Sequence, residues 1–467
     1  MGTYFRLTEA GKLRLRSFSW ALLLIVIVPN LLFVVMAWLA GVGRSYLNLD
    51  YAVAVFVVAL GFRWSGALLF LFLLLVDLLV VVGQLFPFVR FSDLLYLAKF
   101  TFISSAQYQV AISVIAVGVL AKCWVLLFFG RRISPVGGVI AFNLLVFLYM
   151  FKVYGVGGGG EDKFWRVSNV SLVSSQVVDF VRYRSSGFLK SAELKGEPFT
   201  VLRADAGAVP QWIGNLDGKA LPEKLLLVVN ESWGVPRDPK VQEALLQPLR
   251  AVSRGEVEQG NLSFVGATVA GELRELCQLR PNNFNLAAVT DGFGECLPNR
   301  LRRKGYRTAS VHGAVSLMYD RRHWYPRVGF DESVFFESSR WPERCYSFPG
   351  ACDLDLRATV GDFLRLDGKR FLYWLTLNSH AFYDQRDIRE DVFDCRLFDV
   401  DSGSRECLNL KLQAQFFHGL GELLGSGILR GTAVLVVGDH EPPLTKTRGE
   451  KAVFAEGMVP WVSFVVE

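Results

Sequence analysis

The chain has 467 residues, of which 52% are hydrophobic, and its mean hydropathy is +0.32. It is too long for one ordinary domain, and its apolar excess excludes a purely soluble protein. The formal net charge of +6 is modest. Because no basic stripe is interleaved with aromatic residues, this charge favours contact with a membrane surface over nucleic acid binding.

The apolar residues are concentrated in the first third of the chain. The sequence predicts about five membrane spans there, near residues 18–42, 46–62, 67–88, 107–130 and 133–154. The second is the weakest, because the apolar run from Tyr51 to Phe62 is short for a crossing of ~20 residues and Arg63 ends it. A tilted or partly re-entrant segment is the alternative. We expect an all-α transmembrane domain over residues 1–155.

Basic residues give the orientation of this domain. Lysines and arginines precede the first span and separate the fourth from the fifth: Arg6, Lys12, Arg14, Arg16, Arg131 and Arg132. Such residues mark cytoplasmic segments, so an odd number of spans places everything after Gly155 outside the cytoplasm. The loop that carries Arg90 and Lys99 would lie outside and is a mild exception.

The cysteines test the orientation independently. Cys123 lies within a predicted span, whereas the other six fall in the exported part: Cys277, Cys296, Cys345, Cys352, Cys395 and Cys407. An even number there favours disulfides in an oxidising compartment, and six buried free thiols are the alternative. The sequence leaves the pairing open, although the short separations favour Cys345 with Cys352 and Cys395 with Cys407.

The part after the membrane divides in two. Residues 156–220 begin with a glycine-rich stretch, and apolar residues then recur near helical spacing between Lys163 and Lys195, which predicts an amphipathic connector on the membrane surface. From residue 221 onward, buried-strand runs alternate with helical patterns. The strand runs are Leu225–Val229, Phe371–Leu377, Ala433–Val437 and Val459–Val466, and the helical stretches are 242–252, 297–304 and 408–424. This alternation predicts an α/β domain with a mostly parallel central sheet over residues 221–467.

Polar side chains follow three of these strand runs. Glu231 follows the first, His380 follows the second, and Asp439 with His440 follows the third. Ligands of parallel sheets bind at the carboxyl ends of strands. Carboxylate oxygens and imidazoles suit Zn²⁺ or Mn²⁺. One such residue is commonly structural, but their coincidence at three strand ends predicts a metal site.

Five segments carry a resemblance to a known family. They are "LLLVVNESWG" (225–234), "LPNRLRRKGYRTASVHG" (297–313), "MYDRRHWYPRVGFDE" (318–332), "LTLNSHAFYD" (375–384) and "VLVVGDHEPP" (434–443). In this order they resemble the alkaline phosphatase/sulfatase superfamily, and within it the membrane-anchored lipoteichoic acid synthases and phosphoethanolamine transferases. The resemblance implies a multi-pass protein of the bacterial inner membrane with a periplasmic or otherwise extracytoplasmic catalytic domain of the alkaline phosphatase fold.

The resemblance also implies a ligand set. One or more divalent ions, Zn²⁺ or Mn²⁺, would be held by Glu231, Thr268, Asp439 and His440, and Thr268 would be the nucleophile. Thr268 lies in "GATVAGE" (266–272), where Glu272 follows four residues later. A threonine that opens a helix beside a metal is a sound nucleophile, because the metal favours the alkoxide and helix-end amides hold phosphate oxygens.

Further residues are implied as substrate contacts. His380 and Arg321 would bind the phosphate, with Tyr319 standing where the family often has tryptophan. Arginine can grip a phosphoryl group bidentately, and His380 could also act as acid or base. Ser263 is the alternative nucleophile. We expect His312 to pack after a strand rather than to bind metal.

The implied activity is transfer of a phospholipid head group, phosphoethanolamine or phosphoglycerol, through a phospho-threonine onto a cell-envelope glycan or glycolipid. A phosphodiesterase or phosphatase of the same fold is one alternative, and a non-catalytic glycan-binding module is another. A sulfatase is a further one, because "CLPNR" (296–300) fits the pattern in which cysteine becomes formylglycine. The helix "RLRRKGY" follows it directly, however, which favours Cys296 as a disulfide partner.

Overall fold

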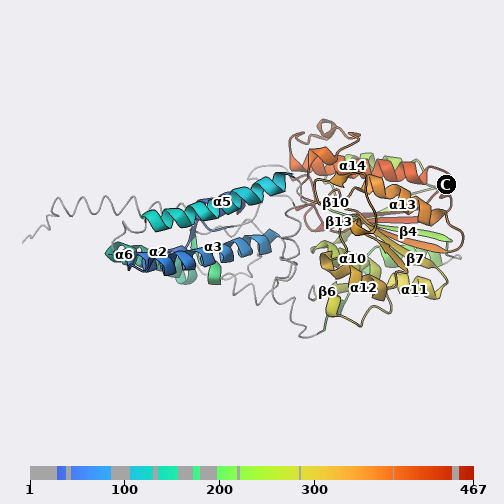
Figure 1. The fold of residues 1–467 in the computed structure, drawn as a ribbon. Coiled ribbons are helices and arrows are strands. Elements are labelled where there is room, and N and C mark those ends of the chain that lie inside the picture. The colour runs from blue at the N-terminus through green and yellow to red at the C-terminus, as the bar shows by residue number, and fades with distance from the viewer. Residues whose placement is uncertain are drawn as a thin grey trace, which may run out of the picture. The chain divides into compact units, whose positions relative to one another are not determined.

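The computed structural model describes residues 29–37, 44–85, 106–129, 135–155, 172–178, 197–217, 221–282, 286–381, 383–443 and 452–467. The chain divides into two compact units, Met1–Glu193 and Leu194–Glu467 (Figure 1). The predicted domain boundaries at residues 155 and 220 stay predictions. The predicted amphipathic connector lies mostly outside the described residues.

Described residues of the first unit are mainly helical. Besides residues 29–37, the helices are α2 (Asp50–Ala59), α3 (Arg63–Leu85), α5 (Ala106–Phe129) and α6 (Pro135–Gly155). Within the part of the chain that the structure describes, one helix, Arg63–Val81 within α3, is long and apolar enough to cross a membrane. Three shorter apolar helices accompany it, at Asp50–Ala59, Ile112–Phe128 and Phe142–Phe151. The helices fall on the predicted segments, but a bundle of five spans is not shown.

Helix α2 occupies the weakest of the predicted spans. Its 10 residues rise about 15 Å, which is half of a hydrocarbon core of about 30 Å. Before it, β1 (Leu47–Asn48) pairs in parallel with β2 (Val173–Ser174). This helix is too short to cross by itself, so the re-entrant alternative fits the segment and the odd span count loses its support here.

A buried polar cluster joins α3 to the segment before α2. Asp77 of α3 has no exposed surface and accepts hydrogen bonds from Arg44 Nη2 at 2.6 Å, from Asn48 Nδ2 at 3.3 Å and from the Tyr51 hydroxyl. A charge in apolar surroundings is costly unless it is paired and hydrogen-bonded. The cluster therefore links α3 to the segment before α2 through buried hydrogen bonds to Asp77.

The second unit contains a seven-stranded sheet in the order β5-β13-β12-β4-β11-β7-β8. Its strands are β4 (Lys224–Asn230), β5 (Glu258–Ser263), β7 (Arg307–His312), β8 (Glu332–Val334), β11 (Arg370–Leu375), β12 (Ala433–Gly438) and β13 (Met458–Val465). Neighbours from β12 to β8 are parallel, whereas β13 is antiparallel to both β12 and β5. The predicted α/β domain is confirmed, with a mixed sheet whose centre is parallel.

Helices cover both faces of the sheet (Figure 1). One face packs on α9 (Pro239–Arg250), α13 (Asp353–Arg365) and α14 (Arg405–Leu424), and the other on α8 (Val209–Asp217), α10 (Thr268–Cys277), α11 (Leu297–Arg303) and α12 (Arg321–Val328). Successive residues of β4 belong to opposite cores, Leu226 to the first and Leu227 to the second. A strand buried on both faces reads as an unbroken apolar run, which is why β4, β11 and β12 were predictable.

Strand register places the predicted site residues at one edge. Gly438 of β12 lies opposite Asn230 of β4, and Leu375 of β11 lies opposite both Val229 and His312. The carboxyl ends of these four parallel strands are therefore level, and the residues that follow them meet there.

Three disulfides occur in the second unit: Cys277–Cys296, Cys345–Cys352 and Cys395–Cys407. Both local pairings favoured by the sequence are confirmed, and Cys296 is a disulfide partner, as expected. Cys123 in α5 is a free thiol. The alternative of six free thiols does not hold.

The Asp77 cluster leads to a stability prediction. Asp77→Leu leaves the Arg44 guanidinium buried without its counter-ion, and removal of one partner of a buried pair costs about 3 kcal/mol. We expect a lower Tm of the helical signal for the purified chain in detergent, measured by circular dichroism. The double variant Arg44→Leu/Asp77→Leu removes both charges and should recover part of the loss. Equal losses in the single and double variants would contradict the ion-pair explanation.

Candidate metal centre

Three potential ligands meet at the carboxyl edge of the sheet. Glu231 follows β4, and Asp439 and His440 follow β12. One ligand atom from each lies within 4.8 Å of the others. His440 Nε2 is 3.3 Å from Glu231 Oε1 and 3.4 Å from Asp439 Oδ2. The structure thus brings together three of the four side chains that the strand-end pattern predicted, all except His380.

Only one of the two carboxylate oxygens of Asp439 accepts hydrogen bonds from the protein. Its Oδ1 accepts from the backbone N–H of Ser232 at 2.8 Å and of His440 at 2.6 Å. Its Oδ2 is buried without a hydrogen-bond partner. Leaving a buried acceptor unpaired costs free energy, so such an oxygen calls for an explanation, and a cation supplies one.

The tautomer of His440 suits a ligand. Its Nδ1 lies 2.9 Å from the carbonyl oxygen of Glu441, to which it can donate a proton. Nδ1 then carries one hydrogen, and Nε2, which faces Glu231 and Asp439, would present its lone pair to a metal that displaces its own proton. Histidines that bind metals are oriented in this way by a hydrogen bond from the other ring nitrogen.

Thr268 completes the cluster as the first residue of α10. Its Oγ1 is 3.2 Å from Glu231 Oε2 and 3.5 Å from His440 Nε2. The helix approaches closely because residue 271 is a glycine: a Cβ there would lie 2.8 Å from the Asp439 carbonyl oxygen. Ser263, the alternative nucleophile, ends the edge strand β5. These contacts favour Thr268.

The Glu231 loop is held by several polar side chains. Its backbone N–H donates to Thr376 Oγ1 at 2.8 Å, and its carbonyl accepts from Ser379 Oγ at 2.6 Å and Gln413 Nε2 at 2.9 Å. Ser232 adopts a φ of 51°, a left-handed conformation that costs energy for a residue other than glycine. Its hydroxyl donates to Glu231 Oε1 at 2.8 Å. The left-handed conformation of Ser232 thus accompanies a hydrogen bond that orients the Glu231 carboxylate.

One supporting residue was missed from the sequence. Arg274 of α10 is buried and donates to the carbonyl oxygens of Gly438 at 2.7 Å and Asp439 at 3.3 Å, while its Nε pairs with Glu275 at 2.6 Å. It therefore fixes the backbone that presents Asp439. The only sequence signal was a charged pair in a short helix, and such a pair usually lies on a solvated face.

Arg321 lies in a second buried cluster with Glu272. Its Nε and Nη2 are 3.1 Å and 2.7 Å from Glu272 Oε1, and the ring of Tyr319 lies 5.1 Å from the guanidinium carbon. The hydroxyls of Tyr325 and Tyr373 donate to Glu272 Oε2. Burial, followed by the Glu272 charge, raises the pKa of Tyr325 well above its usual value, so this hydroxyl stays a donor. Two guanidinium nitrogens are thus engaged, and Nη1 is the one with a weaker contact, 3.4 Å from the Met318 carbonyl.

Two further histidines belong to the neighbourhood. His380 follows β11, and its Nδ1 lies against the Ala381 carbonyl. His312 ends β7, and its Nδ1 donates to the Leu375 carbonyl at 3.0 Å. Burial, then the charge of Arg321, lowers the pKa of His312 well below its usual value, so this imidazole is neutral. It packs after a strand as expected, yet it also lies within the electrostatic reach of Arg321.

Electrostatics shows that the ligand set holds protons when no metal is bound. Burial, then the charge of Glu231, raises the pKa of Asp439 to about 8. Burial opposes the charged form of His440, but Asp439 and Glu231 outweigh it and raise the pKa to about 10. For Glu231, burial is outweighed by the charges of His380 and His440, which lower its pKa. A cation would replace the protons on Asp439 and His440.

The comparisons with known proteins agree with this fold. Residues 263–458 match the family described as Sulfatase. This match, over less than half of the chain, confirms the resemblance at the level of the superfamily. Within the matched segment, Cys296 is bonded to Cys277 and so is not a formylglycine precursor in this structure. No curated protein matches the chain.

Several solved structures are similar to the chain. The lipoteichoic acid synthase LtaP from Listeria monocytogenes is 18% identical, with a TM-score of 0.40 and coverage of 56% of this chain and 68% of the other. The C-terminal periplasmic domain of EcEptC from Escherichia coli is 14% identical, with a TM-score of 0.34 and coverage of 53% of this chain and 73% of the other. The Streptococcus pyogenes phosphoglycerol transferase GacH, in complex with sn-glycerol-1-phosphate, is 12% identical, with a TM-score of 0.37 and coverage of 58% of this chain and 77% of the other. At these values the similarities do not indicate a shared substrate.

The proton content of the ligand set leads to a metal-binding prediction. We expect Zn²⁺ or Mn²⁺ binding at pH 7 to release protons from the ligand set, because the pKa values of Asp439 and His440 are raised in the metal-free protein. The affinity should fall as the pH is lowered. Isothermal titration calorimetry in buffers of different ionisation enthalpy measures the metal affinity and the number of protons released.

Two variants control this experiment. Asp439→Asn removes one ligand charge and should abolish tight binding. Glu422→Gln alters a different acidic group, Glu390 with His418 and Glu422, and should leave the titration unchanged. Binding that persists in Asp439→Asn, or that is lost in Glu422→Gln, would place the metal elsewhere.

Proposed function

We propose that the chain transfers a phospholipid head group, phosphoethanolamine or phosphoglycerol, to a cell-envelope glycan or glycolipid. One observation carries the proposal: a buried hydroxyl at a helix start, Thr268, lies against Glu231 and His440 beside an unpaired oxygen of Asp439. A nucleophile within a set of metal ligands is the arrangement expected for attack on a phosphoryl group.

The residues present fit a divalent ion. Glu231, Asp439, His440 and Thr268 would hold Zn²⁺ or Mn²⁺ with oxygen and imidazole ligands. The bound ion would lower the pKa of the Thr268 hydroxyl and offset charge on the phosphoryl oxygens. Asp439 Oδ2 is buried without a hydrogen-bond partner, 3.4 Å from His440 Nε2, and this is the observation that supports a cation in the set.

The proposed reaction has two steps. In the first, Thr268 Oγ1, which has lost its proton to solvent, forms a bond to phosphorus while the bond from phosphorus to the diacylglycerol oxygen breaks, and protonated His380 gives the leaving oxygen its proton. In the second, an acceptor hydroxyl attacks the same phosphorus and gives its proton to His380 Nε2, and the bond to Thr268 breaks. His380 Nε2 is free for this role because Nδ1 lies against the Ala381 carbonyl.

Arg321 and Tyr319 are proposed as phosphate contacts. The ion pair with Glu272 leaves Nη1 of Arg321 as the nitrogen that can reach an anion. Because Glu272 is held in turn by Tyr325 and Tyr373, the guanidinium is fixed before substrate arrives. Such preorganised charge stabilises a transition state without reorganisation at the moment of reaction.

The membrane unit is proposed to keep the enzyme beside its lipid donor. The apolar helices of the first unit and the disulfides of the second support an anchored enzyme of the bacterial inner membrane whose catalytic domain lies outside the cytoplasm. A hydrolase of the same fold would use the same residues with water as acceptor, so the acceptor must be tested directly.

The test uses the purified full chain with Zn²⁺ or Mn²⁺ and head-group-labelled phosphatidylethanolamine or phosphatidylglycerol. We expect diacylglycerol release and a labelled adduct on Thr268, located by mass spectrometry. Thr268→Ala should remove the labelled adduct and lower the rate of diacylglycerol release by more than about a thousandfold. Thr268→Ser should retain a slower reaction, because a hydroxyl remains.

Ser263→Ala is the matched control and should keep full turnover. Loss of the adduct in Ser263→Ala but not in Thr268→Ala would reverse the nucleophile assignment. Label that passes only to water, even with a glycan acceptor present, would favour the hydrolase. No release from either lipid would contradict the proposed activity.

A further inference from the structure

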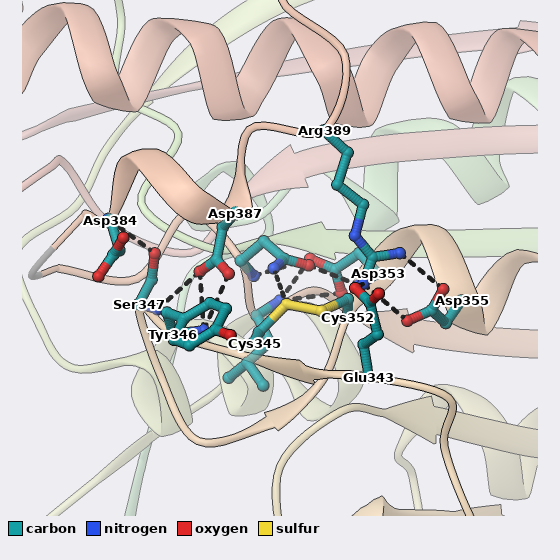
Figure 2. The surroundings of a disulfide bond; sticks show 12 residues. Glu343, Cys345, Tyr346, Ser347, Cys352, Asp353, Asp355, Asp384, Asp387 and Arg389 are labelled. Carbon is teal, nitrogen blue, oxygen red and sulfur yellow. Dashed lines mark hydrogen bonds and ion pairs between the residues drawn. A yellow bond between two sulfur atoms is a disulfide. The ribbon is translucent and has the colours of Figure 1, made fainter. Parts of the chain in front are cut away.

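The loop closed by the Cys345–Cys352 disulfide lies beside His380 in the fold. Its ends pair as a short antiparallel ribbon, β9 (Arg344–Cys345) with β10 (Gly350–Ala351). Figure 2 shows the disulfide among the carboxylates of Asp353 and Asp387. The loop has no part in the metal centre, yet several bonds join it to the strand ends that form that centre.

One set of bonds joins the loop to the end of β11. The Asp353 carboxylate, directly after Cys352, accepts from the backbone N–H of Leu377 at 3.0 Å and of Asn378 at 2.8 Å. The Asn378 side chain in turn accepts from the Asp353 N–H and donates to Cys345 Sγ. Cys345 and Asp353 thus hold the two residues that lead to Ser379 and His380: Asn378 is hydrogen-bonded to both, and Leu377 to Asp353.

A second set joins the loop to the chain after His380. Asp387 accepts from the backbone N–H of Tyr346 at 2.8 Å and of Ser347 at 2.6 Å, and Ser347 Oγ accepts from the Asp384 N–H at 3.0 Å (Figure 2). Both sides of the His380 segment are therefore fastened to the same disulfide loop.

A third contact joins the loop to the end of β7. The Ala351 N–H donates to the Gly313 carbonyl at 2.9 Å, directly after His312. Gly350 permits this approach, because a Cβ at that position would collide with the Gly313 carbonyl oxygen. The loop is consequently fixed against two neighbouring strand ends.

At its tip the loop presents Phe348 to His380. The two ring centroids are 4.7 Å apart with an interplanar angle of 53°. Both side chains are half-buried. Phe348 is not among the described side chains of the two hydrophobic cores that flank the sheet. Its aromatic contact with the His380 imidazole therefore gives it a role other than core packing.

We propose that Phe348 is a positioning residue for His380 and that the Cys345–Cys352 disulfide holds it there. Phe348 would limit rotation of the imidazole so that Nε2 stays directed at the reacting phosphoryl group. This inference rests on the proposed function for its turnover readout. Displacement of a catalytic group by about 1 Å can cost about a hundredfold in rate.

The first test is a double-mutant cycle in the full chain. Phe348→Ala should lower kcat for diacylglycerol release about tenfold with little change in KM, because the imidazole loses its orientation. Phe348→Tyr keeps the ring and should restore most of the rate. In a His380→Ala background, Phe348→Ala should cause no further loss. An equal loss in both backgrounds would overturn the proposal, since Phe348 would then act independently of His380.

The second test compares two disulfides. Cys345→Ser/Cys352→Ser should lower kcat as Phe348→Ala does. Cys395→Ser/Cys407→Ser removes a disulfide elsewhere in the same unit and should keep kcat at a temperature where both variants are folded by circular dichroism. Equal kcat values in the two folded variants would contradict a specific role of the first disulfide.

A third readout does not depend on turnover. Diethylpyrocarbonate modifies histidines, and mass spectrometry gives the rate at each one. Phe348→Ala should raise the rate at His380 relative to His418, which lies on α14 and serves as internal reference. An unchanged ratio would overturn the inference. Wild-type chain that releases no diacylglycerol but shows the raised ratio in Phe348→Ala would refute the proposed function alone.

Discussion

The second unit depends on how it compensates the negative charge of one buried group of potential metal ligands. Glu231, Asp439 and His440 converge within 4.8 Å, and one oxygen of Asp439 has no hydrogen-bond partner. Without a cation, protons must occupy the site. The surroundings hold the ligands in place: Arg274 binds the backbone before and at Asp439, and Gly271 lets α10 approach it.

A second buried charge system lies beside the first and is kept separate. Glu272 takes two nitrogens of Arg321 and two tyrosine hydroxyls, so its charge is compensated within its own cluster. The helix that begins with Thr268 therefore contributes to both systems, the hydroxyl at residue 268 to the ligands and the carboxylate one turn later to the arginine. Packing of α10 sets the spacing between Thr268, the proposed nucleophile, and Arg321, the proposed phosphate contact.

Sequence reasoning succeeded where burial on both faces leaves an unbroken apolar run, as in β4, β11 and β12. It did not give β5 or β7 as strand runs, because "EQGNLS" and "RTASVH" mix polar and apolar residues, and β7 was implied only by the expectation that His312 packs after a strand. The strand-end rule found Glu231, His380, Asp439 and His440, whereas Thr268 came only from the family resemblance. Arg274 and the Arg321 ion pair depend on tertiary approach of α10 and α12, which no local pattern records.

The Cys277–Cys296 disulfide has an energetic consequence for the helix that carries Thr268. Cys277 is the last residue of α10, and Cys296 directly precedes α11, so the bond closes a loop with a sequence separation of 19. A crosslink of this span lowers the entropy of the unfolded chain by an amount worth about 3 kcal/mol. Domains are commonly stable by only about 5–15 kcal/mol. A reduced chain would lose a sizeable share of that margin, so the redox state of the compartment would set how much of the chain holds Thr268 in its folded position.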